Sequence, residues 1–332
     1  MRRTVGILFL VVILVFGCTF FGEEKPQYQI PKDNITQNET NETEEYLPPE
    51  PVNVTVMNET IGYTETPAEE IEVYFINVGY GDCTLIKKGD FDILIDAGGT
   101  EEQGERIVEF LENKEVDDLE LVIATMYTKD HIAGMRNVFQ RFKVEQYWDN
   151  GMDEKGNKYY DELQEIIELK NIPIKHPEFG ERVFLNGISI TVLNPQKTKY
   201  PTGNPTLNSV TLHIVDREFA LYMTDVEAGV QNTILANYPN IKSNIMKVPN
   251  HGASTVAVGG GEMVTLFSII DKVQPEKAVV FVGPNELGMP NPTVLEAYKV
   301  RGADVLRTDL NGTIEVISDG YEYNITTGIE QE

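Results

Sequence analysis

The sequence predicts an α/β (α+β) protein in which two β-sheets pack face to face and helices cover their outer faces, a four-layer αββα sandwich. Short apolar runs of strand type alternate with amphipathic helical patterns over residues 71–327, and groups of strands with flanking helices occur in both halves of this region. Of the 332 residues, 41% are apolar, which is enough to bury a sizeable core. We therefore expect one globular domain, residues 71–327, behind a front segment of different character.

Residues 1–18 have the pattern of a secretory signal peptide. Arg2 and Arg3 precede an apolar run from Gly6 to Gly17, and Cys18 follows a small residue, as in lipoprotein signals whose cysteine is lipidated. The alternative is an uncleaved anchor helix over residues 4–21, barely long enough to span a bilayer. Both interpretations predict an extracytoplasmic protein anchored to the outer face of the cell membrane.

Residues 19–70 are predicted to be a disordered, acidic linker. They contain 12 acidic and 2 basic residues, several prolines and no apolar periodicity, so self-repulsion favours an extended chain. The linker also carries five Asn-x-Ser/Thr acceptor patterns for N-glycosylation. These candidates are Asn34, Asn38, Asn41, Asn53 and Asn58. Either a glycosylated stalk or chance in an Asn/Thr-rich spacer would produce them.

The first half of the domain contains strand patterns, two clear helical patterns and a helix expected after His131. Alternating or continuous apolar residues predict the strands, and apolar residues at spacings of three and four predict the helices. The strands are Ile71–Asn77, Cys83–Lys87, Phe91–Asp96 and Leu119–Thr125, and the helices are Glu102–Asn113 and Tyr159–Leu169.

The second half repeats this scheme in broad terms. Its strands are Arg182–Leu185, Ile188–Leu193, Ser209–Val215, Phe219–Met223, Ile245–Val248, Ala278–Val282, Asp304–Arg307, Thr313–Ile317 and Tyr321–Ile325. Its helices are Gly229–Tyr238, Glu262–Val273 and Pro292–Arg301. Strand groups with helices in each half are what a two-sheet sandwich requires.

Charge and cysteine content restrict the chemistry. The formal net charge is −26, which disfavours broad contact with a polyanion such as nucleic acid. Cys18 and Cys83 are the two cysteines, so there is neither a disulfide framework nor a Cys-rich zinc motif. Any metal must therefore be held by histidines and carboxylates.

Polar residues with ligand chemistry follow three predicted strands. Asp130 and His131 follow Leu119–Thr125, Asp225 follows Phe219–Met223, and His251 follows Ile245–Val248. Two imidazoles and two carboxylates suit a divalent cation with nitrogen and oxygen ligands. The other two histidines are interpreted differently: His213 as a paired histidine within a strand, and His176 as a solvated loop residue.

Several stretches together resemble the metallo-β-lactamase fold, and most closely the extracytoplasmic hydrolase domain of ComEC-type competence proteins. They are Phe75–Asp82, Leu94–Gly99, Asn208–Leu212, Met223–Asp225, Lys247–Gly252, Val282–Asn285 and Arg307–Ile314. This resemblance implies an αββα sandwich with a metal site in the cleft between the sheets. There, a metal-bound water would attack a phosphodiester, amide, ester or thioester.

The family's HxHxDH motif aligns on Met126, Thr128, Asp130 and His131, so both leading histidines are missing. Met289 and Asn291 also stand where ComEC-like chains tend to have histidines. In the binuclear pattern the leading pair serves one metal. The resemblance implies that the other metal's set is complete here as Asp130, His131, Asp225 and His251, with Asp130 and Asp225 taking part in catalysis. It implies structural roles for Asp82 and Asp96.

Two hypotheses follow. The first is a membrane-tethered hydrolase with at most one Zn²⁺ or Mn²⁺, acting on a phosphodiester or a similar bond. The second is a catalytically degenerate binding or scaffolding module of the same fold. We expect a monomer in either case, and nucleic acid is a partner by family analogy only. Lys129, inside the motif, either replaces part of the missing metal's charge or points to water.

Overall fold

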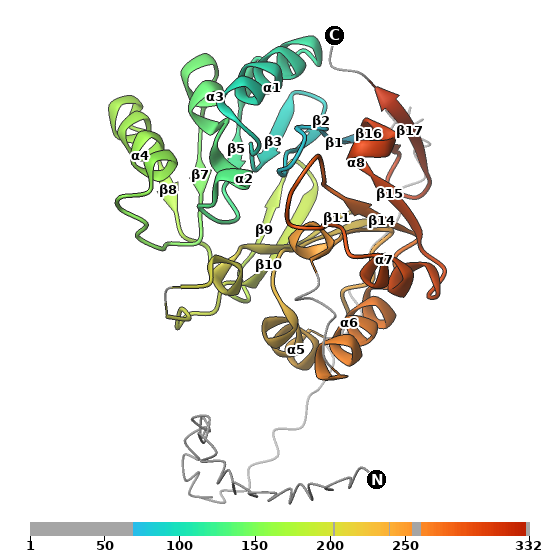
Figure 1. The fold of residues 1–332 in the computed structure, drawn as a ribbon. Helices are drawn as coiled ribbons and strands as arrows, with labels where there is room; N and C mark the ends of the chain where they lie inside the picture. The colour runs from blue at the N-terminus through green and yellow to red at the C-terminus, as the bar shows by residue number, and fades with distance from the viewer. Residues whose placement is uncertain (1–68, 202, 239, 254–259, 330–332) are drawn as a thin grey trace, which may run out of the picture. The chain divides into compact units, whose positions relative to one another are not determined.

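The computed structural model describes residues 69–201, 203–238, 240–253 and 260–329 (Figure 1). The predicted signal peptide 1–18 with Cys18, and all five glycosylation candidates of the linker, lie outside the described residues. Within the described ranges, no helix combines the length and the apolar character needed to cross a bilayer.

In the described part of the chain, the first sheet has eight strands in the order β17-β16-β1-β2-β3-β5-β7-β8. Their bounds are β1 Ile71–Phe75, β2 Thr84–Lys88, β3 Phe91–Ile95, β5 Leu121–Ile123, β7 Tyr147–Trp148, β8 Ile174–Lys175, β16 Thr313–Ser318 and β17 Tyr323–Ile329. Strands β3, β5, β7 and β8 run parallel to one another. Their carboxyl ends therefore meet at one edge of the sheet.

The second sheet has seven described strands in the order β15-β14-β13-β12-β11-β10-β9. Their bounds are β9 Arg182–Leu185, β10 Ile188–Asn194, β11 Thr211–Asp216, β12 Phe219–Met223, β13 Ile245–Lys247, β14 Lys277–Val280 and β15 Asp304–Arg307. Strands β12 to β15 are parallel. A small parallel pair, β4 Asp118–Leu119 and β6 Lys143–Val144, lies beside the first sheet.

Three apolar cores make the four layers. The middle core joins the facing sides of the sheets, for example Val73 and Phe75 of β1 against Leu212 and Leu221. The outer core of the first sheet packs against α1 Glu101–Asn113, α3 Met135–Arg141 and α4 Lys158–Lys170. That of the second sheet packs against α5 Ala228–Asn237, α6 Gly260–Val273 and α7 Pro292–Lys299 (Figure 1). The predicted αββα sandwich is confirmed.

Helices α1 and α4 each begin after a capping side chain. Thr100 accepts a hydrogen bond from the Gln103 N–H at the start of α1, and Asn157 accepts one from Tyr159 N–H at the start of α4. These side chains satisfy backbone donors that the first helical turn leaves unpaired. Asn171, in the left-handed conformation, ends α4.

The differences from prediction lie in short elements. Strands β4, β6, β7 and β8 were not predicted separately, because a strand of two residues shows no periodicity. The segment expected to become helical after His131 already turns at Lys129, in α2 Lys129–Ile132, so Asp130 and His131 sit inside a helical turn. Strand β17 runs to Ile329, past the predicted end at Ile325.

Candidate metal site

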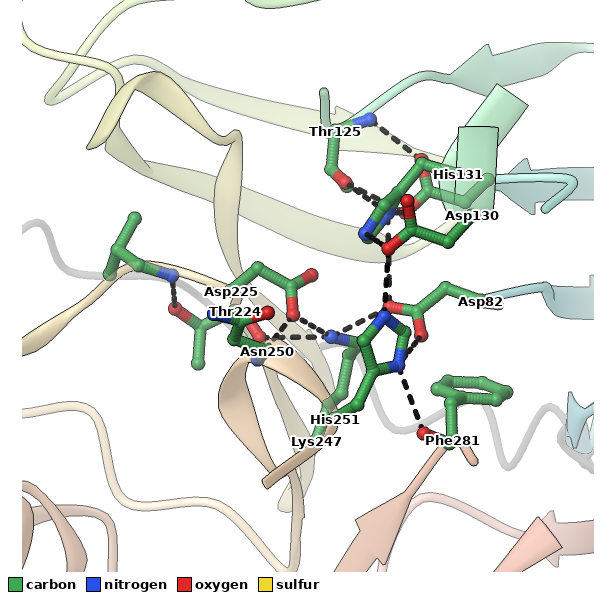
Figure 2. Close-up of polar contacts among 12 residues, drawn as sticks. Asp82, Thr125, Asp130, His131, Thr224, Asp225, Lys247, Asn250, His251 and Phe281 are labelled. Carbon is green, nitrogen blue, oxygen red and sulfur yellow. Dashed lines mark hydrogen bonds and ion pairs between the residues drawn. The ribbon is translucent and has the colours of Figure 1, made fainter. Parts of the chain in front are cut away.

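The candidate ligands lie where strands of both sheets end. Asp96 follows β3, and Asp225 follows β12. His251 lies in η2 Pro249–Gly252, just after β13, and Asp130 and His131 lie in α2. Figure 2 shows the side chains of Asp130, His131, Asp225 and His251 converging on one small volume, joined by Asp82 from the loop between β1 and β2. The structure therefore brings together all four residues predicted from the sequence.

Backbone hydrogen bonds hold α2 in place. The Asp82 N–H donates to the Asp130 carbonyl at 2.8 Å, and the Ala97 N–H donates to the His131 carbonyl at 2.8 Å. Gly98 lies against this turn so closely that a Cβ atom there would be 1.7 Å from the Asp130 carbonyl oxygen. Only glycine permits this approach. The loops after β1 and β3 thus position the first two candidate ligands.

His251 is held in an unusual backbone conformation. Asn250 and His251 have φ values of 45° and 51°, in the left-handed region that residues other than glycine seldom adopt. The Asn250 N–H donates to Asp225 Oδ1 at 2.7 Å, which supports the turn. A Cβ atom at Gly252 would lie 2.8 Å from Pro290 Cβ, so glycine is needed for this close approach. Such strain is often found at functional sites.

Both imidazoles are fixed through Nδ1. His131 Nδ1 lies 2.9 Å from Asp96 Oδ2, and His251 Nδ1 lies 2.9 Å from the Phe281 carbonyl oxygen. Carboxylates and carbonyls only accept hydrogen bonds, so each Nδ1 carries the proton. The Nε2 atoms then remain for another partner. This is the arrangement of metal-ligating histidines, whose second nitrogen is held by a fixed acceptor.

The two Nε2 atoms and Asp130 form an outer group of ligands. Asp130 Oδ2 lies 2.9 Å from His251 Nε2 and 3.6 Å from His131 Nε2. One candidate ligand atom from each of the three residues lies within 4.8 Å of the others. Both histidines are buried, whereas the Asp130 side chain is 25% exposed, which leaves the group open on one side. Two nitrogens and a carboxylate facing a solvent-accessible side fit a divalent cation with open positions.

An inner group of carboxylates holds a lysine. Lys247 is 3% exposed. Its Nζ lies 2.6 Å from Asp82 Oδ2, contacts Asp225 Oδ1 and donates to the Thr224 carbonyl at 3.1 Å (Figure 2). Asp225, predicted as a metal ligand, is thus already paired with an ammonium. Lys129, considered from the sequence as the substitute charge, is exposed.

The electrostatics of the site favour cations. Burial lowers the pKa of His131, but the charges of Asp96 and Asp82 outweigh it and raise that pKa to about 10. The pKa of His251 is also raised, since Asp82 and Asp130 outweigh its burial. Burial raises the pKa of Asp130, yet the neighbouring imidazoles bring it below its usual range. The group therefore holds either protons or a metal ion between its carboxylates.

Lys247 escaped the sequence analysis, although one signal pointed to it. It is a charged residue at the end of the buried strand β13, four residues before His251. A fully buried lysine needs a partner, and a strand-end aspartate is an obvious candidate. The other two histidines behave as predicted in part. His213 Nε2 pairs with the Lys242 carbonyl at 3.2 Å, while the half-exposed His176 also pairs with buried Asp149, at 2.5 Å.

A pocket of about 210 Å³ adjoins the missing half of the motif. It is lined by Tyr127, Thr128, Asn150, Met152, Glu154, Asn157, Gly203, Asn204, Pro205 and Asn208. Thr128, which stands at a leading histidine position, forms part of its wall. Its polar lining consists mainly of amides and hydroxyls, which are weak metal ligands, with Glu154 as the one carboxylate and no histidine. Within the described residues, this side of the cleft has no counterpart to the outer group.

Comparisons with known proteins agree with the fold. The chain is 27% identical over 275 residues to ComE operon protein 3 of Bacillus subtilis (strain 168), covering 75% of this chain. The match spans only 33% of that relative, about a third of its length. Among solved structures, the metallo-β-lactamase fold protein YhfI from Bacillus subtilis matches with a TM-score of 0.52 and 14% identity, over 74% of this chain and 99% of that one. The family model of the metallo-β-lactamase superfamily matches residues 76–283, so the chain belongs to the metallo-β-lactamase superfamily.

Proposed function

We propose that this protein is an extracytoplasmic, membrane-tethered hydrolase that uses one divalent cation held by Asp130, His131 and His251. The observation that carries the proposal is the convergence of two Nε2 atoms on Asp130 Oδ2 while both Nδ1 atoms are held by fixed acceptors. Nitrogen and oxygen ligands suit Zn²⁺ or Mn²⁺. When bound, such an ion polarises a scissile bond and activates water for attack on it.

The chain's own groups prepare the site for that chemistry. Asp130 is ionised at neutral pH, since its pKa lies below its usual range, and its partly exposed carboxylate would be the anionic ligand on the open side. The Tyr80 ring packs against the His251 ring, tilted by 41° at a centroid distance of 4.4 Å, and its hydroxyl donates to Met289 Sδ. Tyr80 therefore walls the site and limits the freedom of His251.

Asp225 acts differently from a simple ligand in this proposal. Its Oδ1 accepts from the Asn250 N–H and pairs with Lys247. Both contacts hold the turn that presents His251. Its role in catalysis is therefore to position that imidazole, and it becomes a fourth ligand only if Lys247 moves away.

The substrate proposed is a small phosphodiester or a similar bond. A phosphodiester is one of the bonds that the family resemblance implies. The net charge of −26 disfavours a long polyanion, so a short or neutral-ended diester fits better than duplex nucleic acid. The apolar run ending at Cys18 supports the tether, and loss of membrane attachment in Cys18→Ser would support lipidation.

Hydrolysis of bis(p-nitrophenyl) phosphate tests the activity. The purified full chain in detergent is expected to turn over this diester with added Zn²⁺ or Mn²⁺ and to stop with a chelator. Asp130→Asn should abolish this turnover, because it removes the open-side carboxylate. Asp149→Asn is the matched control, since it alters a buried aspartate that pairs with a histidine outside the site. Absence of metal-dependent turnover would favour the alternative, a binding or scaffolding module.

A further inference from the structure

A lysine side chain occupies the inner group of carboxylates. Asp82 comes from the first sheet's β1–β2 loop, Asp225 ends β12 of the second sheet, and Lys247 Nζ bridges the two. Asp82 and Asp225 are 2% and 1% exposed. One ammonium thus pairs with two buried carboxylates across the cleft, at the place where a cation would be held.

The geometry of the carboxylates is that of a cation site. One ligand atom from each of Asp82, Asp96, His131 and Asp225 lies within 4.8 Å of the others. Asp82 Oδ1 is buried and receives no hydrogen bond; His251 Nδ1 lies 3.4 Å away but already donates to the Phe281 carbonyl. A carboxylate oxygen buried without a donor is costly, so this oxygen depends on nearby positive charge.

The ammonium, rather than the size of the space beside it, excludes a second cation, because two positive charges in a buried site repel strongly. The cavity adjoining Lys247 measures about 10 Å³ and is lined by Asp82, Asp96, Thr125, Asp225 and four further residues of the strand ends. A volume of this size holds about one water molecule at most. A divalent ion can enter the inner group only when the lysine side chain leaves.

We propose that Lys247 is a built-in cation that permanently fills the inner position and so limits the site to a single divalent ion. Lys247 is a positioning residue: it holds Asp82 and Asp225, and through Asp225 the turn that carries His251. The carboxylates keep the ability to bind metal, which the lysine masks. The proposal deepens the proposed function, because it states why one ion is held and where the other charge comes from.

Ion counting on Lys247→Ala tests this directly. In full-length protein titrated with Mn²⁺ and followed by electron paramagnetic resonance, the variant should bind one more ion per chain than the unaltered protein. Lys88→Ala is the matched control, since Lys88 is a buried lysine paired with Asp216 at 2.8 Å outside the site. The number of Mn²⁺ ions bound per chain should be the same in Lys88→Ala as in the unaltered protein.

A second variant at the same position is tested in case Lys247→Ala does not fold. Lys247→Gln keeps a donor near the carboxylates but removes the charge, and it is purified with and without Mn²⁺ beside Lys247→Ala. An extra ion in either variant supports the proposal. Equal ion counts in a folded variant and in the unaltered protein overturn the proposal. Insolubility of both variants even with Mn²⁺ also overturns it, because an ion able to fill the inner group should replace the lost charge and restore folding.

The same titration separates this proposal from the proposed function. If the unaltered protein binds no ion but Lys247→Ala binds one, the outer site fails while the inner masked site stands. If both bind one, the outer site stands and the role of Lys247 fails.

Discussion

Replacing Asp96 by asparagine should weaken metal binding without removing any ligand. Asp96 Oδ2 accepts from His131 Nδ1 at 2.9 Å and from Thr125 Oγ1 at 2.7 Å, and Oδ1 accepts from the Thr125 N–H at 2.8 Å. In Asp96→Asn the single amide oxygen stays with the Thr125 N–H, so the amide nitrogen faces His131 Nδ1. That nitrogen can only donate.

The imidazole must then accept at Nδ1 and carry its proton on Nε2, the atom that faces the metal position. Loss of such a supporting acceptor typically lowers metal affinity about 10- to 100-fold. This factor corresponds to about 1.4 to 2.7 kcal/mol of binding free energy. Calorimetric titration with Zn²⁺ gives the dissociation constant, and nitrogen NMR of the histidine ring gives the tautomer.

The matched control is Asp149→Asn, which makes the same change in the Asp149–His176 pair. Zn²⁺ affinity should stay within about twofold of the unaltered protein in this control, because the pair lies outside the outer and inner groups. Unchanged Zn²⁺ affinity in Asp96→Asn, with the ring proton still on Nδ1, would refute the role assigned to the Asp96–His131 bond.

Three further outcomes are expected. Gly98→Ala should abolish metal binding or folding, because the new Cβ would meet the Asp130 carbonyl oxygen. In the control Gly229→Ala the new Cβ meets no atom, so denaturant titration should show a free energy of unfolding higher by about 0.5 to 1 kcal/mol. Zn²⁺ binding at pH 7.5 should release at least one proton, seen as a buffer-dependent calorimetric enthalpy, since the pKa of His131 is about 10; a buffer-independent enthalpy would contradict protonated rings. In metal-free protein, the stabilisation from charged His131 should be complete below about pH 6.5 and lost as pH rises through about 10, so melting temperatures that do not fall over this range would argue against it.

The fold could be predicted from the sequence because most of its strands are short apolar runs between turn residues, and its long helices have clear periodicity. The residues of the outer group could be named as well, since each follows a strand in a motif that survives in part. Their pairing with Asp96 and Phe281 could not, because it depends on loops meeting from different strands.

Lys247 shows where sequence reasoning stopped. Lys129 lies inside the motif and was considered as the substitute for the missing metal's charge, yet its side chain is exposed to solvent. Burial of Lys247 follows from the packing of β13 between β12 and β14, a property of the assembled sheet. Lys247 and Asp82 are far apart in the sequence, so no local pattern predicts that their side chains form an ion pair.

Counting the metal ions bound to the purified full chain decides between one ion, two ions and none. Elemental analysis after dialysis against Zn²⁺ or Mn²⁺ should find one ion per chain, and His251→Ala should lose it because one of the two Nε2 ligands is gone. A count of zero would contradict the outer site, and a count of two would contradict the role of Lys247 as the second cation.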